Sequence, residues 1–368
     1  MEDGIMGCKY FPTSRVQRLN CLAGRDEEIE TLAANIKSKT WTALTGSKFT
    51  GKTLLVKSVA EYLRKTEGYV TLYVDVKTAG NFERLVETAY RKAPMTVKRR
   101  MELFLFRKSL DVTNRSSFKA QETLPPQILF WKLLTTLPEQ SVVVLDNVHV
   151  LGRETALLTG VLWDALNEKG SRKHLPGLIV TGPTPQAVLH FLNPSEIGWG
   201  SVDISKGTHF VGREFGHVHL APWSDEFSRR YLYEGLAECG VSPSMREVAH
   251  VAEVSGGLPA VLSFYGRFRC RGYPRDRILS MIDGRLFSQV RREIRDIIKE
   301  RFPKKNTSLF KALSLYARGV SIREASHRTG VSRQTVYEML RTLIEWGYLN
   351  EGYGFVSPAY ARAVMKLR

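Results

Sequence analysis

The sequence of 368 residues predicts an α/β core built on a parallel sheet, then a helical lid, then a C-terminal winged-helix domain. Three observations predict this fold class. Short β-branched runs alternate with helical stretches over the first 220 residues, strand signals disappear from Asp225 onward, and the last 65 residues form a separate helical pattern. The expected boundaries are 1–222 for the core, 223–300 for the lid and 301–368 for the winged helix.

Each predicted strand is short, apolar and bounded by Gly, Pro or polar residues. The five strands are Thr40 to Thr45, Tyr69 to Val76, Ser141 to Leu145, Leu178 to Thr181 and His217 to Leu220. Helical patterns such as Lys52 to Lys65 and Gln127 to Leu137 separate them. Strands that are joined through helices form a parallel sheet with both faces covered, so we expect helices on each side.

The end of the chain has the pattern of a helix-turn-helix. Helices are expected at Leu309 to Arg318, at Ser321 to Arg328 and, after a turn with Gly330, from the N-cap Ser332 to about Glu345. Residues 347–356 predict a β-hairpin, the wing. Apolar residues of the third helix face the core, so its other face projects outward. That face carries side chains that contact bases or phosphates, namely Arg333, Gln334, Tyr337 and Arg341.

The composition is that of a soluble globular protein, with 43% hydrophobic and 25% charged residues. Apolar runs such as Ser141 to Leu145 are too short to cross a bilayer, and no signal peptide follows Met1, so a cytoplasmic location is expected. The cysteines are scattered without CxxC spacing: Cys8, Cys21, Cys239 and Cys270. We expect four structural thiols in a reducing compartment, with neither a disulfide framework nor a zinc site.

The charge is unevenly distributed along the chain. The whole chain has 54 basic and 37 acidic side chains, a net charge of +17, and residues 266–368 alone contain 22 basic and 9 acidic ones. A basic C-terminal third beside a nearly neutral remainder favours a polyanion partner, here double-stranded DNA. A protein that is basic throughout for other reasons, such as a thermophilic origin, is the alternative.

A second basic segment interrupts the predicted core. Seven of residues 91–108 are basic, one (Glu102) is acidic, and apolar residues alternate with them. We expect an insertion at about 91–118 that contacts nucleic acid or a partner, or that forms an amphipathic helix with a solvated basic face.

The strongest local motif follows the first predicted strand. Residues 46–53 match GxxxxGK[ST] between a strand and a helix, which is the context of a phosphate-binding P-loop. The residues are Gly46, Ser47, Lys48, Phe49, Thr50, Gly51, Lys52 and Thr53. Backbone N–H groups and the helix N-terminus attract phosphate there, with Lys52 reaching the β- and γ-phosphates and Thr53 ligating Mg²⁺. The motif therefore predicts a bound nucleotide.

An acid at the end of another buried strand supplies the second part of such a site. Asp146 follows the run 142–145 and is expected to hold Mg²⁺ through water, as a Walker B carboxylate does. Asn147 stands where many ATPases have an acid, and an amide orients water but accepts no proton from it. Hydrolysis is thus expected to be slow, or to depend on another group. Thr181 ends the next strand, either as a sensor of the γ-phosphate or simply as a β-branched strand terminus.

Several spaced motifs together resemble the archaeal ATPase family, a STAND-type branch of the P-loop NTPases related to AAA+ proteins. The resemblance covers roughly residues 20–270. Besides the P-loop and Asp146, its motifs are a GRxxEI-type box at Leu22 to Ile29, a YVDV-type strand at Tyr73 to Val76, Thr181-Gly182, a GR segment at Gly212-Arg213, a PWS turn at Pro222 to Ser224 and a GGLP box at Gly256 to Pro259.

The resemblance implies ATP as the nucleotide and assigns roles by position. Gly24 and Arg25 would lie near the adenine and the ribose, and Pro259, in the helical lid, would close over the base. Arg213 would be a charge sensor near the phosphates, or would form a salt bridge to a neighbouring acid. The basic segment 91–108 has no counterpart in the family pattern.

Three hypotheses for function follow. The leading one is an ATP-driven switch whose nucleotide state repositions the winged helix on DNA or on a partner protein. The second is a replication-initiator ATPase of the origin-recognition type. The third is a scaffold that forms homo-oligomers when ATP binds and does not contact DNA, since winged helices also serve as dimerisation or protein-docking modules.

Overall fold

The computed structural model describes residues 10–11, 19, 22–103, 125–170, 172–191 and 215–367. The chain divides into two compact units. The sheet unit comprises Glu27–Thr45 and Leu55–His219, and the lid unit comprises Met1–Asp26, Gly46–Leu54 and Leu220–Arg368. Within the described ranges, no helix is both long and apolar enough to cross a membrane.

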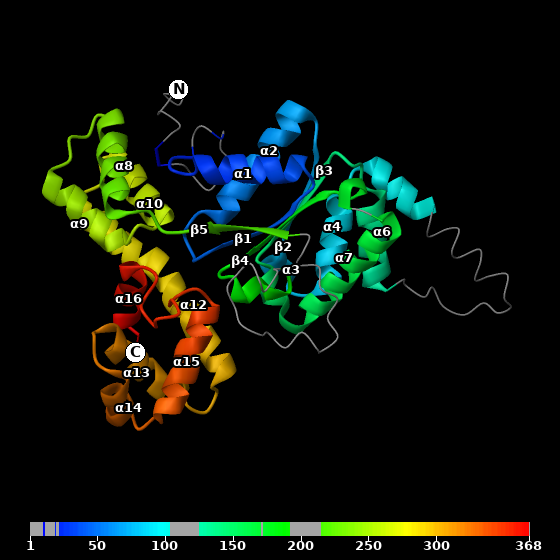
Figure 1. Cartoon of the computed structure of the whole chain (residues 1–368). Coiled ribbons are helices and arrows are strands. Elements are labelled where there is room, and N and C mark those ends of the chain that lie inside the picture. Colours follow the sequence, from blue (N-terminus) through cyan, green and yellow to red (C-terminus); the bar gives the residue numbers. More distant parts are fainter. Residues whose placement is uncertain are drawn as a thin grey trace. The chain divides into compact units, whose positions relative to one another are not determined.

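The sheet unit is built on five strands, as the sequence predicts. They are β1 (Trp41–Gly46), β2 (Val70–Asp75), β3 (Ser141–Asp146), β4 (Gly177–Gly182) and β5 (Phe215–Leu220). Their order is β2-β3-β4-β1-β5 (Figure 1), and the pairs β2–β3, β3–β4 and β1–β4 are parallel. The predicted parallel α/β core is thus confirmed.

Helices cover both faces because both faces of the strands are apolar. The helices of this part are α1 (Asp26–Lys37), α2 (Lys52–Glu67), α3 (Val76–Ala79), α4 (Phe82–Lys92), α6 (Pro126–Thr136), α7 (Thr155–Lys169) and the 3₁₀ turns η2 (Val148–Glu154), η3 (Arg172–His174) and η4 (Gln186–Phe191). Val143 and Leu145 join the apolar cluster of α4, α6 and α7, whereas Val142 and Val144 are equally buried on the opposite face.

The register of the strands brings polar side chains to one edge of the sheet. Leu44 pairs with Thr181, and Asp75 pairs with Asp146. Because the carboxyl ends of parallel strands meet at the same edge, Asp75, Asp146 and Thr181 lie there together, and ligands of open α/β sheets bind at that edge.

The basic insertion is described only in part. Residues 95–103 are helical, Met101 is buried and Leu103 is exposed, and the rest of the predicted insertion lies largely outside the described residues.

The lid unit is almost entirely helical, as predicted from Asp225 onward. Its helices are α8 (Asp225–Glu238), α9 (Met245–Ser255), α10 (Pro259–Cys270), α11 (Arg275–Met281), the π-helical turn η6 (Ile282–Phe287), α12 (Ser288–Arg301), α13 (Asn306–Ala317), α14 (Ile322–Thr329), α15 (Arg333–Glu345) and α16 (Pro358–Met365). Gly256, the first residue of the GGLP box, is the C-cap of α9, with φ 55°.

The helix-turn-helix forms for the expected reasons. The Ser332 hydroxyl accepts the Thr335 N–H (3.2 Å) and caps α15, and Gly330 ends α14 with φ 68°. The wing is shorter than the predicted β-hairpin. It consists of a single antiparallel bridge between Leu349 and Phe355. The turn between them is closed by the Asn350 N–H, which donates to Gly354 O at 2.8 Å.

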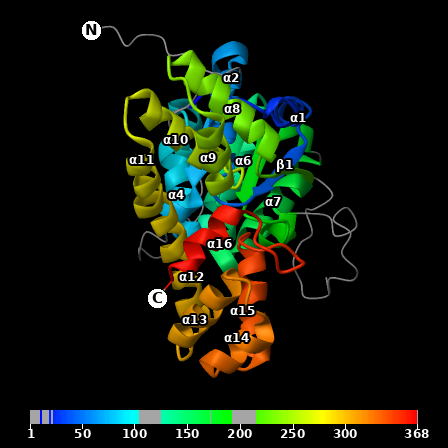
Figure 2. The same cartoon turned by 90° about the vertical axis from the view of Figure 1, so that its left-hand side faces the viewer.

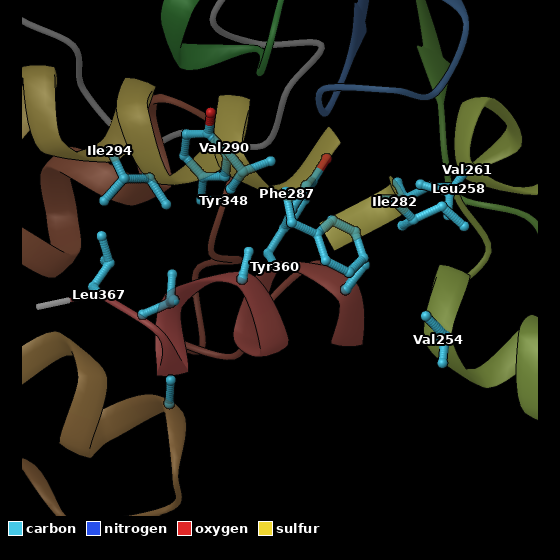
Figure 3. Packing of buried hydrophobic residues seen from close by; sticks show 14 of the residues in the cluster. Val254, Leu258, Val261, Ile282, Phe287, Val290, Ile294, Tyr348, Tyr360 and Leu367 are labelled. Atoms are coloured by element: carbon cyan, nitrogen blue, oxygen red, sulfur yellow. The ribbon is translucent and has the colours of Figure 1, made fainter. Parts of the chain in front are cut away.

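One hydrophobic core runs through the whole lid unit. It contains Val254 and Leu258 of the lid together with Tyr360 and Leu367 of the winged helix. Figure 3 shows Ile282, Phe287, Val290 and Ile294 in a row along the η6–α12 helix, with Ile282 beside Leu258 and Ile294 near Leu367. The predicted lid and winged helix therefore share their apolar interior.

The expectation about the cysteines is wrong in one respect. Cys239 and Cys270 form a disulfide that joins the end of α8 to the end of α10, 31 residues apart. No local pattern indicates this disulfide, because the spacing of the two cysteines is long and only helix packing brings their Cα atoms to 5.7 Å. Closing a loop of this length disfavours the unfolded chain by about 3–4 kcal/mol in the chain-entropy model.

Candidate nucleotide site and nucleic-acid interface

The P-loop begins where β1 ends and leads into α2. Gly46 has φ 153°, Phe49 φ 69° and Gly51 φ 97°, so the loop turns through backbone conformations that favour glycine. A Cβ at Gly46 would lie 2.6 Å from Leu220 O, whereas one at Gly51 would meet no described atom within 4 Å. Glycine is thus needed for packing at Gly46, while the backbone at Gly51 is open to a ligand.

The Lys52 side chain folds back over the loop. Its ammonium donates to Gly46 O and, at 3.0 Å, to Ser47 O. The positive charge is therefore held above the loop, where backbone N–H groups and the start of α2 already favour an anion. Thr53 is the second residue of that helix.

The Arg25 side chain forms hydrogen bonds that hold the P-loop. The guanidinium is buried, with 8% of the residue exposed, and its Nη2 donates to Thr50 O (3.2 Å) and Ala221 O (2.9 Å). Gly24, with φ 61°, lies against the Phe227 ring, which a Cβ would meet at 2.5 Å. Arg25 thus holds the P-loop in place, and the location of these two residues near the adenine and the ribose stays a prediction.

The GGLP box also contacts the P-loop. Pro259 is the first residue of α10, and the next N–H, that of Ala260, donates to Phe49 O (3.2 Å). Gly257 O accepts the Trp223 N–H (2.8 Å), so the box is fixed to the PWS turn as well. Gly257 must be glycine, because a Cβ there would lie 2.1 Å from Trp223 O.

In the sheet unit, Asp146 is the centre of a hydrogen-bond network. The residue is 1% exposed, and its carboxylate accepts the hydroxyls of Tyr73 (2.7 Å) and Thr181 (2.5 Å). Burial, and then the negative charge of Asp146, raises the pKa of Tyr73 well above its ordinary value. Tyr73 therefore stays a hydrogen-bond donor to the carboxylate.

Asn147 joins the same network through its backbone and its side chain. It adopts the left-handed conformation (φ 66°, ψ 43°), which asparagine tolerates well. Its N–H donates to the Thr181 hydroxyl (2.9 Å), and its Nδ2 lies 3.2 Å from an oxygen of Asp75. The strand-end residues Asp146, Asn147 and Thr181, predicted separately from the sequence, are thus brought together.

Sequence reasoning missed Tyr73 and Asp75 as members of this network. Asp75 also caps α3, accepting the Lys77 N–H (3.1 Å) and the Thr78 hydroxyl (2.8 Å). The signal that would have found both was the predicted strand itself, since polar residues near the carboxyl end of a parallel strand lie at the edge where ligands bind. Arg213 lies outside the described residues.

The outer face of α15 is the candidate nucleic-acid interface. Val336, Met339, Leu340 and Leu343 are fully buried, so the predicted core face of the helix is confirmed. The opposite face is exposed and includes Arg333, Gln334, Tyr337 and Arg341, together with Glu338, which accepts a hydrogen bond from the Gln334 Nε2 (3.2 Å). Tyr337 also packs against Tyr353 of the wing, with 5.6 Å between the ring centroids.

Comparisons with known proteins agree with this fold. Residues 305–351 match the family model of the IclR helix-turn-helix domain. No curated protein matches the sequence.

Two solved structures of archaeal proteins resemble the chain over nearly its whole length. A Walker-type ATPase of Pyrococcus abyssi is 18% identical and covers 96% of this chain and 99% of its own, with a TM-score of 0.69. The ORC2 protein of Aeropyrum pernix, in ADPNP-ADP complexes, is 14% identical and covers 100% and 96%, with a TM-score of 0.55. Identities this low establish fold alone. The chain therefore has the fold of archaeal Walker-type ATPases and carries a helix-turn-helix domain of the IclR type in its C-terminal part.

Proposed function

We propose that the chain is an ATP-binding, slowly hydrolysing molecular switch of the STAND-type archaeal ATPase kind, whose nucleotide state controls how its winged helix holds double-stranded DNA. The observation that carries the proposal is that the P-loop, the lid and the winged helix belong to one compact unit with one hydrophobic core. A change at the P-loop therefore has a continuous packed path to α15.

The chemistry of the P-loop suits a nucleoside triphosphate. The loop offers backbone N–H groups, the start of α2 and the Lys52 ammonium to phosphate, and the oxygens of Thr53 and Asp146 are the ligand type that Mg²⁺ prefers. When bound, ATP with Mg²⁺ supplies a transferable phosphoryl group. Gly24, Arg25 and Pro259 remain the proposed neighbours of the base, and Arg213 the proposed charge sensor.

Slow hydrolysis is proposed because no acid follows Asp146. The Asn147 amide points at Asp75, so it orients a neighbour and accepts no proton. The Asp75 carboxylate lies next to that amide. Asp75 is therefore our candidate for the acidic side chain that is absent at position 147 and that would accept a proton from water. Thr181 binds Asp146 directly, which suits a residue that reports on the magnesium ligand.

DNA is the proposed partner because the exposed face of α15 is of the type that reads bases and phosphates. Arg333 and Arg341 lie one at the start and one near the middle of the helix, with Tyr337 between them. The same proposal includes the domain boundaries 1–222, 223–300 and 301–368 and a cytoplasmic location. A homo-oligomer or a protein partner is the proposed alternative to DNA.

An origin-recognition-type initiator is the second candidate. The ORC2 protein matches the chain from end to end, including the winged helix, and its structure is a nucleotide complex. Footprinting on origin DNA separates the two candidates, because an initiator protects a defined sequence.

The test is DNA binding measured at several salt concentrations with ATP, with ADP and without nucleotide, on the wild-type protein and on Lys52→Ala. We expect nucleotide to change DNA affinity in the wild type only. Lys52→Ala should lose at least about 100-fold in ATP affinity, because the loop loses the ammonium proposed to bind the β- and γ-phosphates. Calorimetry measures that loss directly.

Lys65→Ala, an exposed lysine at the end of the same helix, is the matched control and should bind ATP normally. Full ATP affinity in folded Lys52→Ala would mean that the phosphate site is misassigned. DNA binding that is identical in all three nucleotide states would overturn the switch.

A further inference from the structure

The C-terminal helix α16 contacts the P-loop directly. The Tyr360 hydroxyl donates to the backbone carbonyl of Lys48, and the Tyr360 side chain is fully buried. A hydrogen bond that is shielded from water in this way is stronger than one that competes with solvent. The winged-helix domain thus holds a phosphate-binding loop through one of its own side chains.

The Lys48 side chain makes a second link to the same region. Its ammonium forms an ion pair with Glu293 of α12, and both side chains are three-quarters or more buried, at 25% and 21% exposed. Partial burial makes this pair more than a screened surface contact. Tyr348 and Tyr360 pack edge to face with 5.2 Å between the ring centroids, and Figure 3 shows both beside α12 and α16.

The helix α16 also contacts the GGLP box of the lid. The Ser357 hydroxyl caps α16, accepting the Ala359 N–H (3.2 Å), and donates to Gly256 O (2.9 Å). Gly256 must be glycine, because a Cβ would lie 2.2 Å from the Ser357 hydroxyl. Arg362 pairs with Glu253 of α9. The helix α16 is therefore fastened to the P-loop and to the lid at once.

These contacts fix the orientation of two consecutive peptide groups in the P-loop. The Lys48 carbonyl is held by Tyr360 and the Phe49 carbonyl by the N–H of Ala260. In a planar trans peptide the N–H points opposite to the carbonyl, so Tyr360 sets the direction of the Phe49 N–H. P-loops bind phosphate through such N–H groups, and any rotation of this peptide alters the bond to Tyr360.

We propose that α16 is the element that transmits nucleotide state to the winged helix, with Tyr360 and Glu293 as positioning residues that act through Lys48 of the P-loop. The inference rests on the proposed function and names the contact by which it operates. In Figures 1 and 2, α16 lies at the end of the winged helix next to α9 and α12, and α14 lies at the far end. A shift of α16 therefore reaches the DNA-facing helices through the shared core.

Coupling of this kind is reciprocal, so DNA must change ATP affinity by the same factor as ATP changes DNA affinity. Typical factors are about 5- to 150-fold. The ratio of the two DNA dissociation constants, with and without ATP, is thus the quantity that Tyr360 should control, independently of the overall affinity for either ligand.

The test compares Tyr360→Phe with Tyr316→Phe in the full chain. Tyr316 donates a similar bond to a backbone carbonyl, that of Tyr353 (2.7 Å), but within the winged helix. We expect Tyr360→Phe to bring the ratio close to 1. Tyr316→Phe should keep the wild-type ratio, even if its DNA affinity falls. Hydrogen exchange of residues 358–365 should respond to ATP in the wild type and in Tyr316→Phe only.

A second variant tests the same contact in case Tyr360→Phe does not fold. Glu293→Gln keeps the shape of the side chain but removes the charge, and should also reduce the ratio. A wild-type ratio that persists in both Tyr360→Phe and Glu293→Gln, or α16 amides that ignore ATP in the wild type, would overturn the inference and leave the switch standing. A wild-type chain that binds no ATP would overturn the proposed function itself, before any variant is compared.

Discussion

Thr181 connects two groups with one hydroxyl. It donates to the Asp146 carboxylate and accepts the Asn147 N–H, and the residue is fully buried. Without that hydroxyl, the partly buried Asn147 N–H would lose this acceptor, and the Asp146 carboxylate would lose one of its donors. A single buried oxygen therefore matters both for stability and for the position of the proposed magnesium ligand.

Thr181→Val keeps the shape of the side chain and removes the oxygen. We expect the free energy of unfolding to fall by about 2–3 kcal/mol, as for the loss of a buried hydrogen bond to a charged group. Urea unfolding followed by circular dichroism measures it. Thr159→Val is the matched control, since the equally buried Thr159 hydroxyl bonds only carbonyls of its own helix and should cost under about 1 kcal/mol. Equal losses in the two variants would contradict the role of Thr181.

At the scale of elements, β5 is joined to β1 by a pair of histidines. The Thr45 hydroxyl lies 2.7 Å from His217 Nε2 and 2.9 Å from His219 Nδ1. Burial, and then the nearby charge of His219, lowers the pKa of His217 below its ordinary value. The folded state thus favours the neutral ring.

This lowered pKa makes the stability of the folded state depend on pH. Below pH about 6.5 the unfolded chain takes up a proton at His217 that the folded chain resists, so this contribution is present above that pH and is lost as the pH falls. We expect His217→Gln to lose less stability than the wild type between pH 7.5 and 5.5, in denaturant unfolding at both pH values. The exposed His327→Gln should follow the wild type. If the stability of His217→Gln depended on pH as strongly as that of the wild type, His217 would be excluded as the cause of the pH dependence.

At the scale of the whole molecule, the charge asymmetry gives the DNA proposal its physical basis. Residues 266–368 hold 22 basic against 9 acidic side chains, whereas the rest of the chain is nearly neutral. A protein that neutralises phosphates releases counterions from DNA, and each phosphate contact steepens the decline of affinity with salt. The slope of log affinity against log salt therefore reports how many arginines contact the phosphate backbone of DNA.

Replacing Arg333 and Arg341 together by alanine should weaken DNA binding and reduce the slope of log affinity against log salt by about 2, one for each arginine. Fluorescence anisotropy at four or five salt concentrations measures it. Arg229→Ala is the control, an exposed arginine of α8 that pairs with Asp225. A slope that stays unchanged in the double variant would favour a protein-docking role for the winged helix.

The sequence by itself determined the elements and the motifs, because both depend on local pattern. Hydrophobic alternation marked the strands, and the spacing of Gly51, Lys52 and Thr53 marked the P-loop. Ser332 and Gly330 marked the ends of the helix-turn-helix. These signals lie within a few residues of the structures they specify, so no distant contact was needed to find them.

The tertiary structure alone decided which distant residues meet. The disulfide between Cys239 and Cys270, the bond from Asn147 to Asp75 and the contact of Tyr360 with Lys48 join residues that are 31, 72 and 312 positions apart. No local pattern encodes such pairs, because they depend on how helices pack and strands register. The link between the P-loop and the winged helix is of this kind, since it is a property of the shared core and of no single motif.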